Sequence, residues 1–559
     1  MPSNTTPEPK AKTDRRFFWL VTSLAVVVAL LPYAIGLLLT PPGYRFFGHT
    51  YLTVGDTQVY YGYMEQGRHG ALFMDDAMTS EPQRGTLLQW PWMVLGVTAR
   101  FSHLSDQTVF ALGRGAGLVL LIGTLWWAIG WIWKDGLSRR VALILTVFGG
   151  GFGAILHTFW RPDSFFIRSP DVWVAEGFTM PSAMSTPHFL LVTSGIIFVL
   201  VSVERSFQDR EPKRILWAGM AALLTLSIHP FHVLTWVFFW LMLTGLRAYQ
   251  QRRIPVGYMW RWLAVAGMAS PALLYYWLGL KFDPISIGRA AQNINTSLNP
   301  LLTLCAFGIV LPLAIISLRR SWRGKNYGWM VALAMAYLLA IYIPVPFQRR
   351  LSQGYFYPLA LLAVPAAVTG WRWLQTKRAG WRWSMIVLGL GLLSSSWLSV
   401  ATQTVHSYWR ELKYTPDRFY YIPPAYQKLY AYIQQQTLRT DTILTSIFDG
   451  NMLVGATSHH VFMAQSVETI HFNAKGRLLE AFYQHDNQAQ QRTFLSDYTI
   501  CYILDGPRER ALGSAFQPQT WPELKKAWSA GDLALWQTPY CSKAELGRKK
   551  PSPTFLSTE

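Results

Sequence analysis

Charged residues are scarce in this sequence of 559 residues. Asp, Glu, Lys and Arg together make up 14% of the chain, whereas 51% is hydrophobic. A soluble protein carries about 25% charged residues. The deficit excludes an ordinary soluble protein and indicates that much of the chain lies within a membrane.

Cysteine is also scarce, with Cys305, Cys501 and Cys541 as its three occurrences. Three cysteines exclude a metal cluster built from cysteine alone. Cys305 lies in an apolar run and is expected in the core. Cys501 and Cys541 fall in the same polar C-terminal region, where they either form a disulfide or remain two buried thiols.

Acidic residues are few compared with basic ones, and the formal net charge is +20. The basic residues stand in short loops between apolar runs, which is the pattern that orients membrane proteins, so we expect no nucleic-acid partner. The loops that this rule assigns to the cytoplasm are 134–140, 204–214, 247–253, 319–325 and 372–382.

A cleavage site of small residues is missing after the first apolar run. Residues 1–16 are polar and end in basic residues, and the run 17–39 is followed by Thr40-Pro41-Pro42-Gly43. The run is longer than the apolar core of a signal peptide. It therefore predicts an uncleaved anchor with the N-terminal tail, 1–16, in the cytoplasm.

Further apolar runs predict a polytopic α-helical membrane protein, because a helix needs about 20 apolar residues to cross the bilayer. A break at Pro230 makes a hairpin of two spans, since basic residues flank it on both sides. We expect about eleven spans in a transmembrane domain covering 17–402, near 17–39, 108–133, 141–157, 188–203, 215–229, 231–246, 258–280, 301–318, 329–346, 358–375 and 384–402.

The spans leave two large external regions. The first external loop covers 40–107 and includes the run 87–97, which we interpret as a helix on the membrane surface. Residues 403–542 predict a small extracytoplasmic α/β domain, and 543–559 a disordered tail. Within that domain we expect strands at 442–446, 460–464, 499–504 and 532–537 and helices at 423–436, 473–483 and 521–529.

The first external loop contains the strongest candidate for catalysis. Asp56 is the first acid after the first span, and Tyr60 and Tyr61 follow it. A carboxylate at this place can act as a general base, although the same aspartate suits the N-cap of a helix. Asp75, Asp76 and Glu81 are further acids later in the same loop.

Other candidates lie in later loops and spans. Glu176 and His188 can bind a substrate or a divalent metal ion, or belong to a solvated loop. Arg349 and Arg350 lie on the external side against the charge rule, which suits phosphate binding or contact with lipid headgroups. Arg114 is an intramembrane charge that either binds a substrate or reaches the interface. His229 and His232 stand at the hairpin tip, to contact a substrate or cap the broken helix.

The arrangement resembles the GT-C glycosyltransferase superfamily, whose members carry an acid in the first extracytoplasmic loop. The resemblance rests on Gly55-Asp56 early in that loop and on its two expected surface helices, at 56–64 and 87–97. It extends to Pro187-His188, His229-Pro230-Phe231, Gln348-Arg349-Arg350 and, in the C-terminal domain, His460, Glu468-Thr469 and Lys475.

The resemblance implies sugar transfer, with inversion, from a polyprenyl-phosphate-sugar donor to a glycan, lipid or protein acceptor. The implied site is the outer face of a bacterial plasma membrane. Asp56 would act as the base and Arg349 and Arg350 would bind the lipid phosphate. The first loop departs from the superfamily because it has no Asp-x-Asp, so Asp75 and Asp76 would have to take its place in holding a divalent cation, Mg²⁺ or Mn²⁺. Two alternatives remain: a transporter or flippase of a lipid-linked glycan, and a non-enzymatic envelope scaffold. The lack of an internal repeat argues against a secondary transporter.

Overall fold

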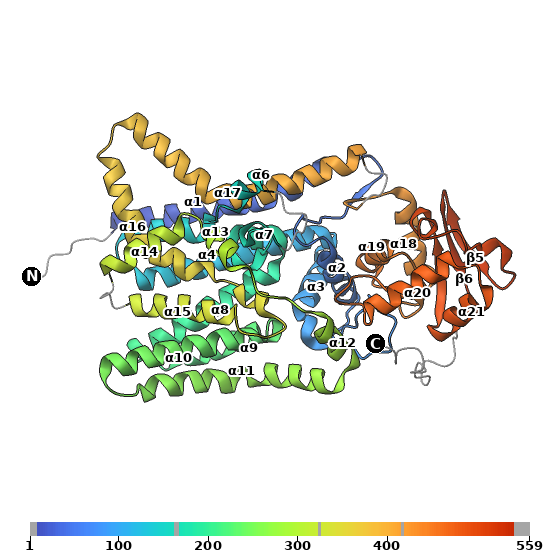
Figure 1. Ribbon diagram of the computed structural model, residues 1–559, viewed down its shortest axis with the longest axis horizontal. Coiled ribbons are helices and arrows are strands. Elements are labelled where there is room, and N and C mark those ends of the chain that lie inside the picture. Colours follow the sequence, from blue (N-terminus) through green and yellow to red (C-terminus); the bar gives the residue numbers. More distant parts are fainter. Residues whose placement is uncertain (1–7, 161–166, 322–325, 415–418, 542–559) are drawn as a thin grey trace, which may run out of the picture.

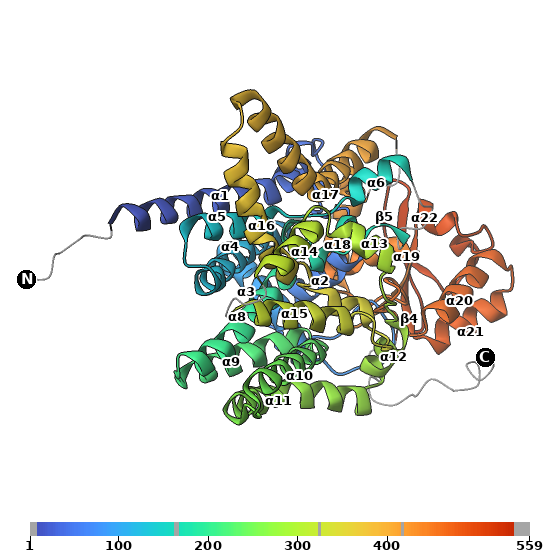
Figure 2. The same cartoon turned by 60° about the vertical axis from the view of Figure 1, so that its left-hand side comes forward.

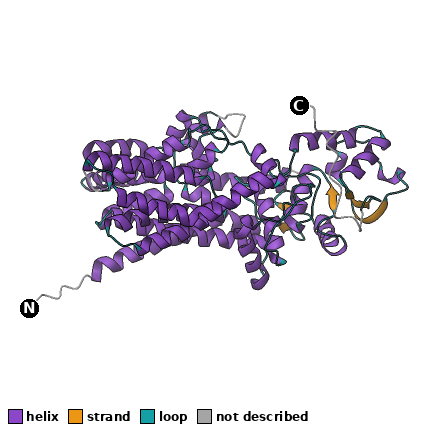
Figure 3. Ribbon diagram, turned by 90° about the horizontal axis from the view of Figure 1, so that it is seen from below, coloured by secondary structure: helices purple, strands orange, loops and turns teal. Residues whose placement is uncertain are grey.

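Helices make up most of the computed structural model, which describes residues 8–160, 167–321, 326–414 and 419–541. The membrane helices fill the left of Figure 1 and the C-terminal domain lies at the right. Figure 3 shows the strands only near the C-terminal end of the molecule. The chain is a multi-pass helical membrane protein with a small sheet, as the sequence indicates. The predicted tail 543–559 lies outside the described residues.

Six helices are long and apolar enough to cross a membrane, and two bent pairs raise the number of spans to as many as eight. The bent pairs are α5 (Gly136–Phe148) with α6 (Gly153–Phe159), at 44°, and α13 (Pro300–Ala306) with Val310–Leu318 of α14 (Val310–Ser321), at 89°. The six are Thr13–Leu38 of α1 (Glu8–Leu38), α4 (Asp106–Ile132), α8 (Pro187–Gln208), α11 (Val256–Phe282), Gln348–Gln375, which ends with α16 (Phe356–Gln375), and α17 (Ala379–Tyr414).

Three further helices occupy the remaining predicted positions: α9 (Lys213–Ile228), α10 (His232–Gln251) and α15 (Tyr327–Ala340). With 16 and 14 residues, α9 and α15 are shorter than a bilayer crossing usually takes. The number of eleven spans therefore remains a prediction. The break at Pro230 is present, because α9 ends at Ile228 and α10 begins at His232. The two helices also have different neighbours: α9 packs on α8 and α11, whereas α10 packs mainly on α15.

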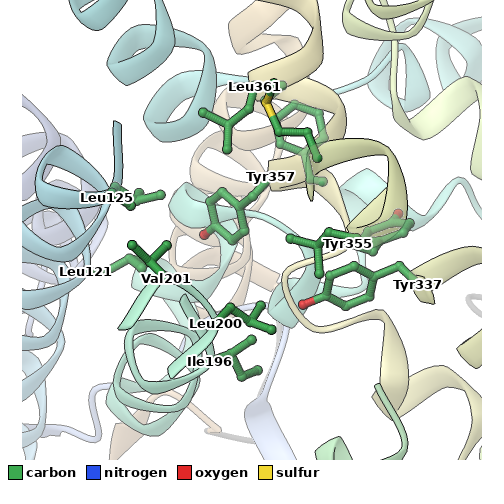
Figure 4. Close-up of a cluster of buried hydrophobic side chains, with 14 of the residues drawn as sticks. Leu121, Leu125, Ile196, Leu200, Val201, Tyr337, Tyr355, Tyr357 and Leu361 are labelled. Atoms are coloured by element: carbon green, nitrogen blue, oxygen red, sulfur yellow. The ribbon is translucent and has the colours of Figure 1, made fainter. Parts of the chain in front are cut away.

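The core of the membrane part lies where α4, α8, α15 and α16 meet. Figure 4 shows tyrosines from α15 and α16 pointing among aliphatic side chains of α4 and α8. The Tyr357 hydroxyl lies 2.9 Å from Thr179 Oγ1, so its polar end is satisfied. The labelled side chains of this buried cluster are Leu121, Leu125, Ile196, Leu200, Val201, Tyr337, Tyr355, Tyr357 and Leu361.

Large apolar side chains are exposed on the outer helices. Trp383, Val387 and Leu388 of α17 are more than half exposed, at 59%, 67% and 53%. Exposure of this kind is costly in water but suits contact with lipid tails. The outer face of α17 is therefore expected to face the bilayer.

The first external loop folds into β1 (Arg45–Phe46), α2 (Val54–Arg68), η1 (Leu87–Gln89) and α3 (Trp90–Ser102). Both helices that we expected in this loop are present. They cross closely at Gly96, where an added Cβ would lie 2.1 Å from the Met64 carbonyl oxygen. Glycine at this position therefore lets α3 lie directly on α2. Figure 1 shows both helices between the membrane helices and the C-terminal domain.

The C-terminal domain is built on a four-stranded sheet with the order β3-β4-β6-β5. β3 pairs parallel to β4, whereas the other neighbours are antiparallel. β2 (Tyr421–Ile422) pairs instead with β1 of the first loop. The sheet strands are β3 (Thr442–Leu444), β4 (Ile500–Asp505), β5 (Lys525–Ala530) and β6 (Leu533–Gln537), and the helices are α18 (Pro424–Gln436), α19 (Ile447–Thr457), α20 (Phe472–Gln484), α21 (Gln488–Asp497), α22 (Pro507–Arg510) and η6 (Pro518–Thr520).

Two of the predicted elements in this domain are wrong. The segment 521–529, expected as a helix, contains strand β5, because a turn at Gly531 folds it back onto β6. Gly531 has a φ of +57°, which glycine adopts without strain. The segment 460–464, expected as a strand, makes only isolated bridges at Val461 and Met463. The other five predicted elements are present.

Candidate active site

Asp56 lies in the first turn of α2, which begins at Val54. The N-cap position is Thr53, so the alternative interpretation of Asp56 as the helix cap is wrong. The Asp56 carboxylate is half-buried, and its Oδ1 accepts a hydrogen bond of 3.0 Å from Gln465 Nε2. Its Oδ2 accepts none from the part of the chain that the structure describes, and is therefore available for proton transfer.

Tyr60 lies one turn after Asp56 on α2, and four charged groups act on its hydroxyl. Its ring stacks on Trp92 at 4.1 Å between centroids. Burial raises the pKa of the Tyr60 hydroxyl well above its ordinary value, and the Asp56 charge raises it further. Arg350 acts on this hydroxyl in the opposite direction, and Glu468 and Glu176 act in the same direction as Asp56. All four charged groups therefore lie near enough to the Tyr60 hydroxyl to act on it.

Glu176 lies on η4 (Ala175–Gly177), just before α7 (Thr179–Ser185). Its side chain is 7% exposed, and its carboxylate has no hydrogen bond or ion pair to any described residue. Glu176 and Asp56 both lie close enough to Arg349 to act on its charge. The structure thus brings together Asp56, Glu176 and the two arginines, which come from segments far apart in the sequence.

The two arginines on η5 (Gln348–Ser352) differ in their contacts. The Arg349 guanidinium donates to Asn295 Oδ1 and lies 4.9 Å from the centre of the Trp173 ring. Arg350 is half-buried and has no side-chain hydrogen bond, ion pair or ring contact within the described ranges. Arg349 is therefore held in place by the protein, whereas Arg350 can offer its hydrogen bonds to an anion.

The histidines form a row beside Tyr60. The His188 ring lies edge-on to Tyr60 at 5.3 Å and to His229 at 5.1 Å. Gln353 lies 2.7 Å from His229 Nδ1 and 3.0 Å from His232 Nε2 through one amide oxygen. Because an amide oxygen only accepts, both of these ring nitrogens carry the proton. His188 therefore lies next to Tyr60, and His229 and His232 continue the row away from Tyr60.

Arg114 and Tyr61 lie in a different place. Arg114 is 1% exposed and donates from Nη1 to the Met184 carbonyl at 2.8 Å. The Tyr61 ring packs edge-on against Phe110 at 5.3 Å. Among described residues, no printed interaction joins either side chain to the Asp56 carboxylate. Arg114 and Tyr61 therefore form a second buried group, and their role in substrate binding stays a prediction.

Asp75 and Asp76 do not fit a shared divalent cation. Arg439 binds both carboxylate oxygens of Asp75, and His460 Nε2 lies 3.3 Å from Oδ2. Burial alone would raise the pKa of Asp75, but these hydrogen bonds hold it well below its usual range. Asp76 is buried beside Glu468, which with burial raises its pKa. Arg439 therefore occupies the Asp75 oxygens that a shared cation would need.

A different group can hold a metal ion by its geometry. Asp441, Cys501 and Cys541 in the C-terminal domain place their ligand atoms within 4.8 Å of one another. Each sulfur lies 3.6 Å from Asp441 Oδ1. The sequence excluded a site of cysteine alone, but did not suggest this mixed one. No disulfide joins Cys501 to Cys541 in the described part of the chain, so their pairing stays a prediction.

Several residues of the site were not found from the sequence. Gln465 contacts Asp56 across 409 residues, and Gln353 joins two histidines that precede it by 124 and 121 residues. Asn295 and Trp173 hold Arg349. Neutral amides and aromatic rings carry no pattern in one sequence that marks a site. Their roles follow only from the packing of distant segments.

Known proteins resemble this chain in structure and not in sequence. No family model matches the sequence, and no curated protein matches it. Solved structures with a similar fold include ArnT from Cupriavidus metallidurans bound to undecaprenyl phosphate, with 12% identity and a TM-score of 0.53 over 95% of this chain and 99% of that one. The archaeal oligosaccharyltransferase AglB from Archaeoglobus fulgidus, in complex with an inhibitory peptide and a dolichol-phosphate, has 11% identity and a TM-score of 0.51 over 88% of this chain and 69% of that one.

A third similar structure is the arabinofuranosyltransferase AftD from mycobacteria. It has 12% identity and a TM-score of 0.50, over 94% of this chain and 41% of AftD. This chain therefore spans less than half the length of AftD. At these identities the likeness is one of fold.

Proposed function

We propose that this chain, which has the GT-C fold of these membrane glycosyltransferases, moves a sugar from a polyprenyl-phosphate donor to an acceptor hydroxyl on the extracytoplasmic face. The observation that carries the proposal is the convergence of Asp56, Glu176 and Arg350 around Tyr60. A base and a guanidinium without a partner among the described residues, both acting on Tyr60, suit the two ends of a glycosyl transfer.

Asp56 is the proposed general base. The acceptor hydroxyl loses its proton to Asp56 Oδ2 while its oxygen forms a bond to the anomeric carbon. Oδ1 is already held by Gln465, so the carboxylate has a fixed orientation with one oxygen open. Attack from the side opposite the leaving group inverts the anomeric centre.

Arg350 is the proposed phosphate ligand. The bond from the anomeric carbon to the phosphate oxygen breaks, and the lipid phosphate leaves with the electron pair. A guanidinium placed at that oxygen stabilises the developing charge. Arg349, already bonded to Asn295, supplies a second positive charge at fixed distance. ArnT bound to undecaprenyl phosphate and AglB in complex with a dolichol-phosphate support a polyprenyl carrier for this chain.

The external position of the site follows from the proposed topology. We place the N-terminus in the cytoplasm, the C-terminal domain outside and the protein in a bacterial plasma membrane. Asp56 lies on a helix that packs directly against α19 of the C-terminal domain, where an added Cβ at Gly62 would lie 3.0 Å from Val454 Cγ1. The acceptor, whether glycan, lipid or protein, would reach the site from this side.

The test is donor consumption by the purified protein. It is incubated with a panel of polyprenyl-phosphate sugars, and release of polyprenyl phosphate is followed by mass spectrometry. The proposal predicts release from at least one donor, and none from that donor with an Asp56→Asn, Arg350→Ala double variant. Movement of intact donors across liposomes without release would instead identify a flippase, and overturn the proposal.

A further inference from the structure

A segment of the C-terminal domain, residues 464–471, lies over the first turn of α2. It is held there by contacts to two other regions. Thr469 Oγ1 donates to the Met78 carbonyl at 2.7 Å, which fixes the segment to the first external loop. Gln292 Nε2, at the end of α12 (Pro284–Gln292), donates to the Thr469 carbonyl at 2.8 Å. An ion pair of 2.5 Å joins Arg289 of α12 to Glu468.

The side-chain amide of Gln465 has a defined orientation within this segment. Its Oε1 accepts hydrogen bonds from the backbone N–H groups of Val467, at 2.6 Å, and Glu468, at 3.0 Å. Because the oxygen is occupied by two donors, the NH₂ group must point the other way. It points at Asp56, and donates to Oδ1 at 3.0 Å.

We propose that Gln465 is a positioning residue for Asp56, so that the C-terminal domain completes the active site. The inference rests on the proposed role of Asp56 as base. An N–H donor on one carboxylate oxygen stabilises the charged form and fixes the rotamer. Gln465 thereby fixes the rotamer of the Asp56 carboxylate and leaves its second oxygen open to the acceptor. Neither effect needs Gln465 to contact the substrate.

Other charged and titratable groups also face Asp56, and they belong in any account of its pH dependence. Tyr60 is one turn away on α2 and carries no charge near neutral pH. The rest come from other elements, namely Arg349 and Arg350 from η5, Glu176 from η4 and Glu468 from the same segment as Gln465. A substitution at Gln465 leaves all of them in place.

The sharpest variant is Gln465→Glu in the full-length protein. A glutamate keeps an oxygen to accept from Val467 and Glu468, so the segment retains its internal hydrogen bonds. It replaces the N–H donor by a negative oxygen facing Asp56. Like charges raise the pKa of a carboxylate. We expect kcat near neutral pH to fall by about 10-fold, which corresponds to the loss of one hydrogen bond to a charged group.

The pH profile separates positioning from a structural role. With the donor that the parent protein consumes, the acid limb of kcat/KM against pH should move up by about one unit in Gln465→Glu. The matched control is Gln484→Glu, an exposed glutamine on α20, which should keep the parent profile. Melting temperature and binding of undecaprenyl phosphate should be the same in all three proteins.

The outcomes distinguish this inference from the proposed function. If Gln465→Glu keeps the pH profile of the parent protein while Asp56→Asn is inactive, the positioning role is overturned and the proposed function stands. A lower rate with an unmoved acid limb also overturns it, because that result indicates a structural effect. Full activity in Asp56→Asn, or no donor consumption by the parent protein, overturns both.

Discussion

Lys475 of the C-terminal domain lies 2.8 Å from Glu81 of the first external loop, and the contact buries the lysine almost completely, at 2% exposed. The ammonium group also donates to Thr79 Oγ1 at 3.2 Å and to the Phe462 carbonyl at 3.0 Å. Burial lowers the pKa of Lys475, and the Glu81 charge opposes that change. The pair therefore fastens the domain next to the segment that contacts Asp56.

Replacing Lys475 by methionine should loosen this attachment. Removing one member of a buried ion pair costs about 3 kcal/mol, since the partner charge is left uncompensated. Urea unfolding followed by fluorescence measures the loss, and Glu81→Gln in the same chain should recover part of it. Lys525→Met, at an exposed position on β5, is the matched control. Equal losses in both variants would contradict the buried pair.

Arg350→Ala should weaken binding of undecaprenyl phosphate by about 10- to 100-fold, the equivalent of about 1.5–3 kcal/mol for a charge-assisted hydrogen bond. Because Arg350 has no partner among the described side chains, its loss should leave the melting temperature unchanged. Arg349→Ala should weaken binding less and also lower the melting temperature, since it removes the contact with Asn295. Arg372→Ala, exposed at the end of α16, is the control for net charge. Unchanged affinity in Arg350→Ala would assign the arginine to lipid headgroups.

Glu509 should make the C-terminal domain less stable at alkaline pH. Burial, followed by the charge of Asp449, raises its pKa from 4.5 to about 8. The folded state therefore holds the proton more tightly than the unfolded state. This contribution is complete below about pH 4.5 and is lost as the pH rises through about 8.

Glu509→Gln cannot ionise and keeps an oxygen for the hydrogen bond from the Ser446 N–H. It should be more stable than the parent by up to about 5 kcal/mol at pH 9, and by less than about 1 kcal/mol at pH 5. Thermal unfolding at the two values measures the difference, with exposed Glu480→Gln as the control. An equal difference in stability between Glu509→Gln and the parent protein at both pH values would contradict the titration of Glu509.

The proposed topology predicts where reporters fused to the chain become active. A reporter joined after Lys377, in the connection between α16 and α17, should read cytoplasmic. One joined after Cys541 should read external, because α17 lies between the two points. A cytoplasmic signal after Cys541 would place the proposed site on the wrong face and mean that the number of spans is even.

Much of the membrane domain follows from local sequence. Apolar runs and proline positions predict α1, α4, α8 and the break at Pro230, because a helix is determined by residues close together in the chain. Strand β5 was missed since its pairing with β6 depends on a turn and on a partner strand.

The candidate site likewise contains some residues that the sequence predicts and others that it does not. Asp56 and Arg350 are noticeable in sequence because a charge beside a membrane is unusual. Gln465 and Asn295 are neutral and lie in unremarkable segments, so their contacts with Asp56 and Arg349 become visible only when the folded chain brings them together. Charge identifies the reacting groups, whereas packing identifies the residues that hold them.

Asp56→Asn tests the central claim most directly. Asparagine keeps the shape of the side chain and, through its oxygen, the hydrogen bond from Gln465, but it cannot take a proton. The measurement is the single-turnover rate of sugar transfer with saturating donor, beside undecaprenyl phosphate affinity and melting temperature. We predict a rate lower by about 10²–10⁴-fold, with affinity and stability unchanged. A rate equal to that of the parent protein would show that the base lies elsewhere and contradict the mechanism.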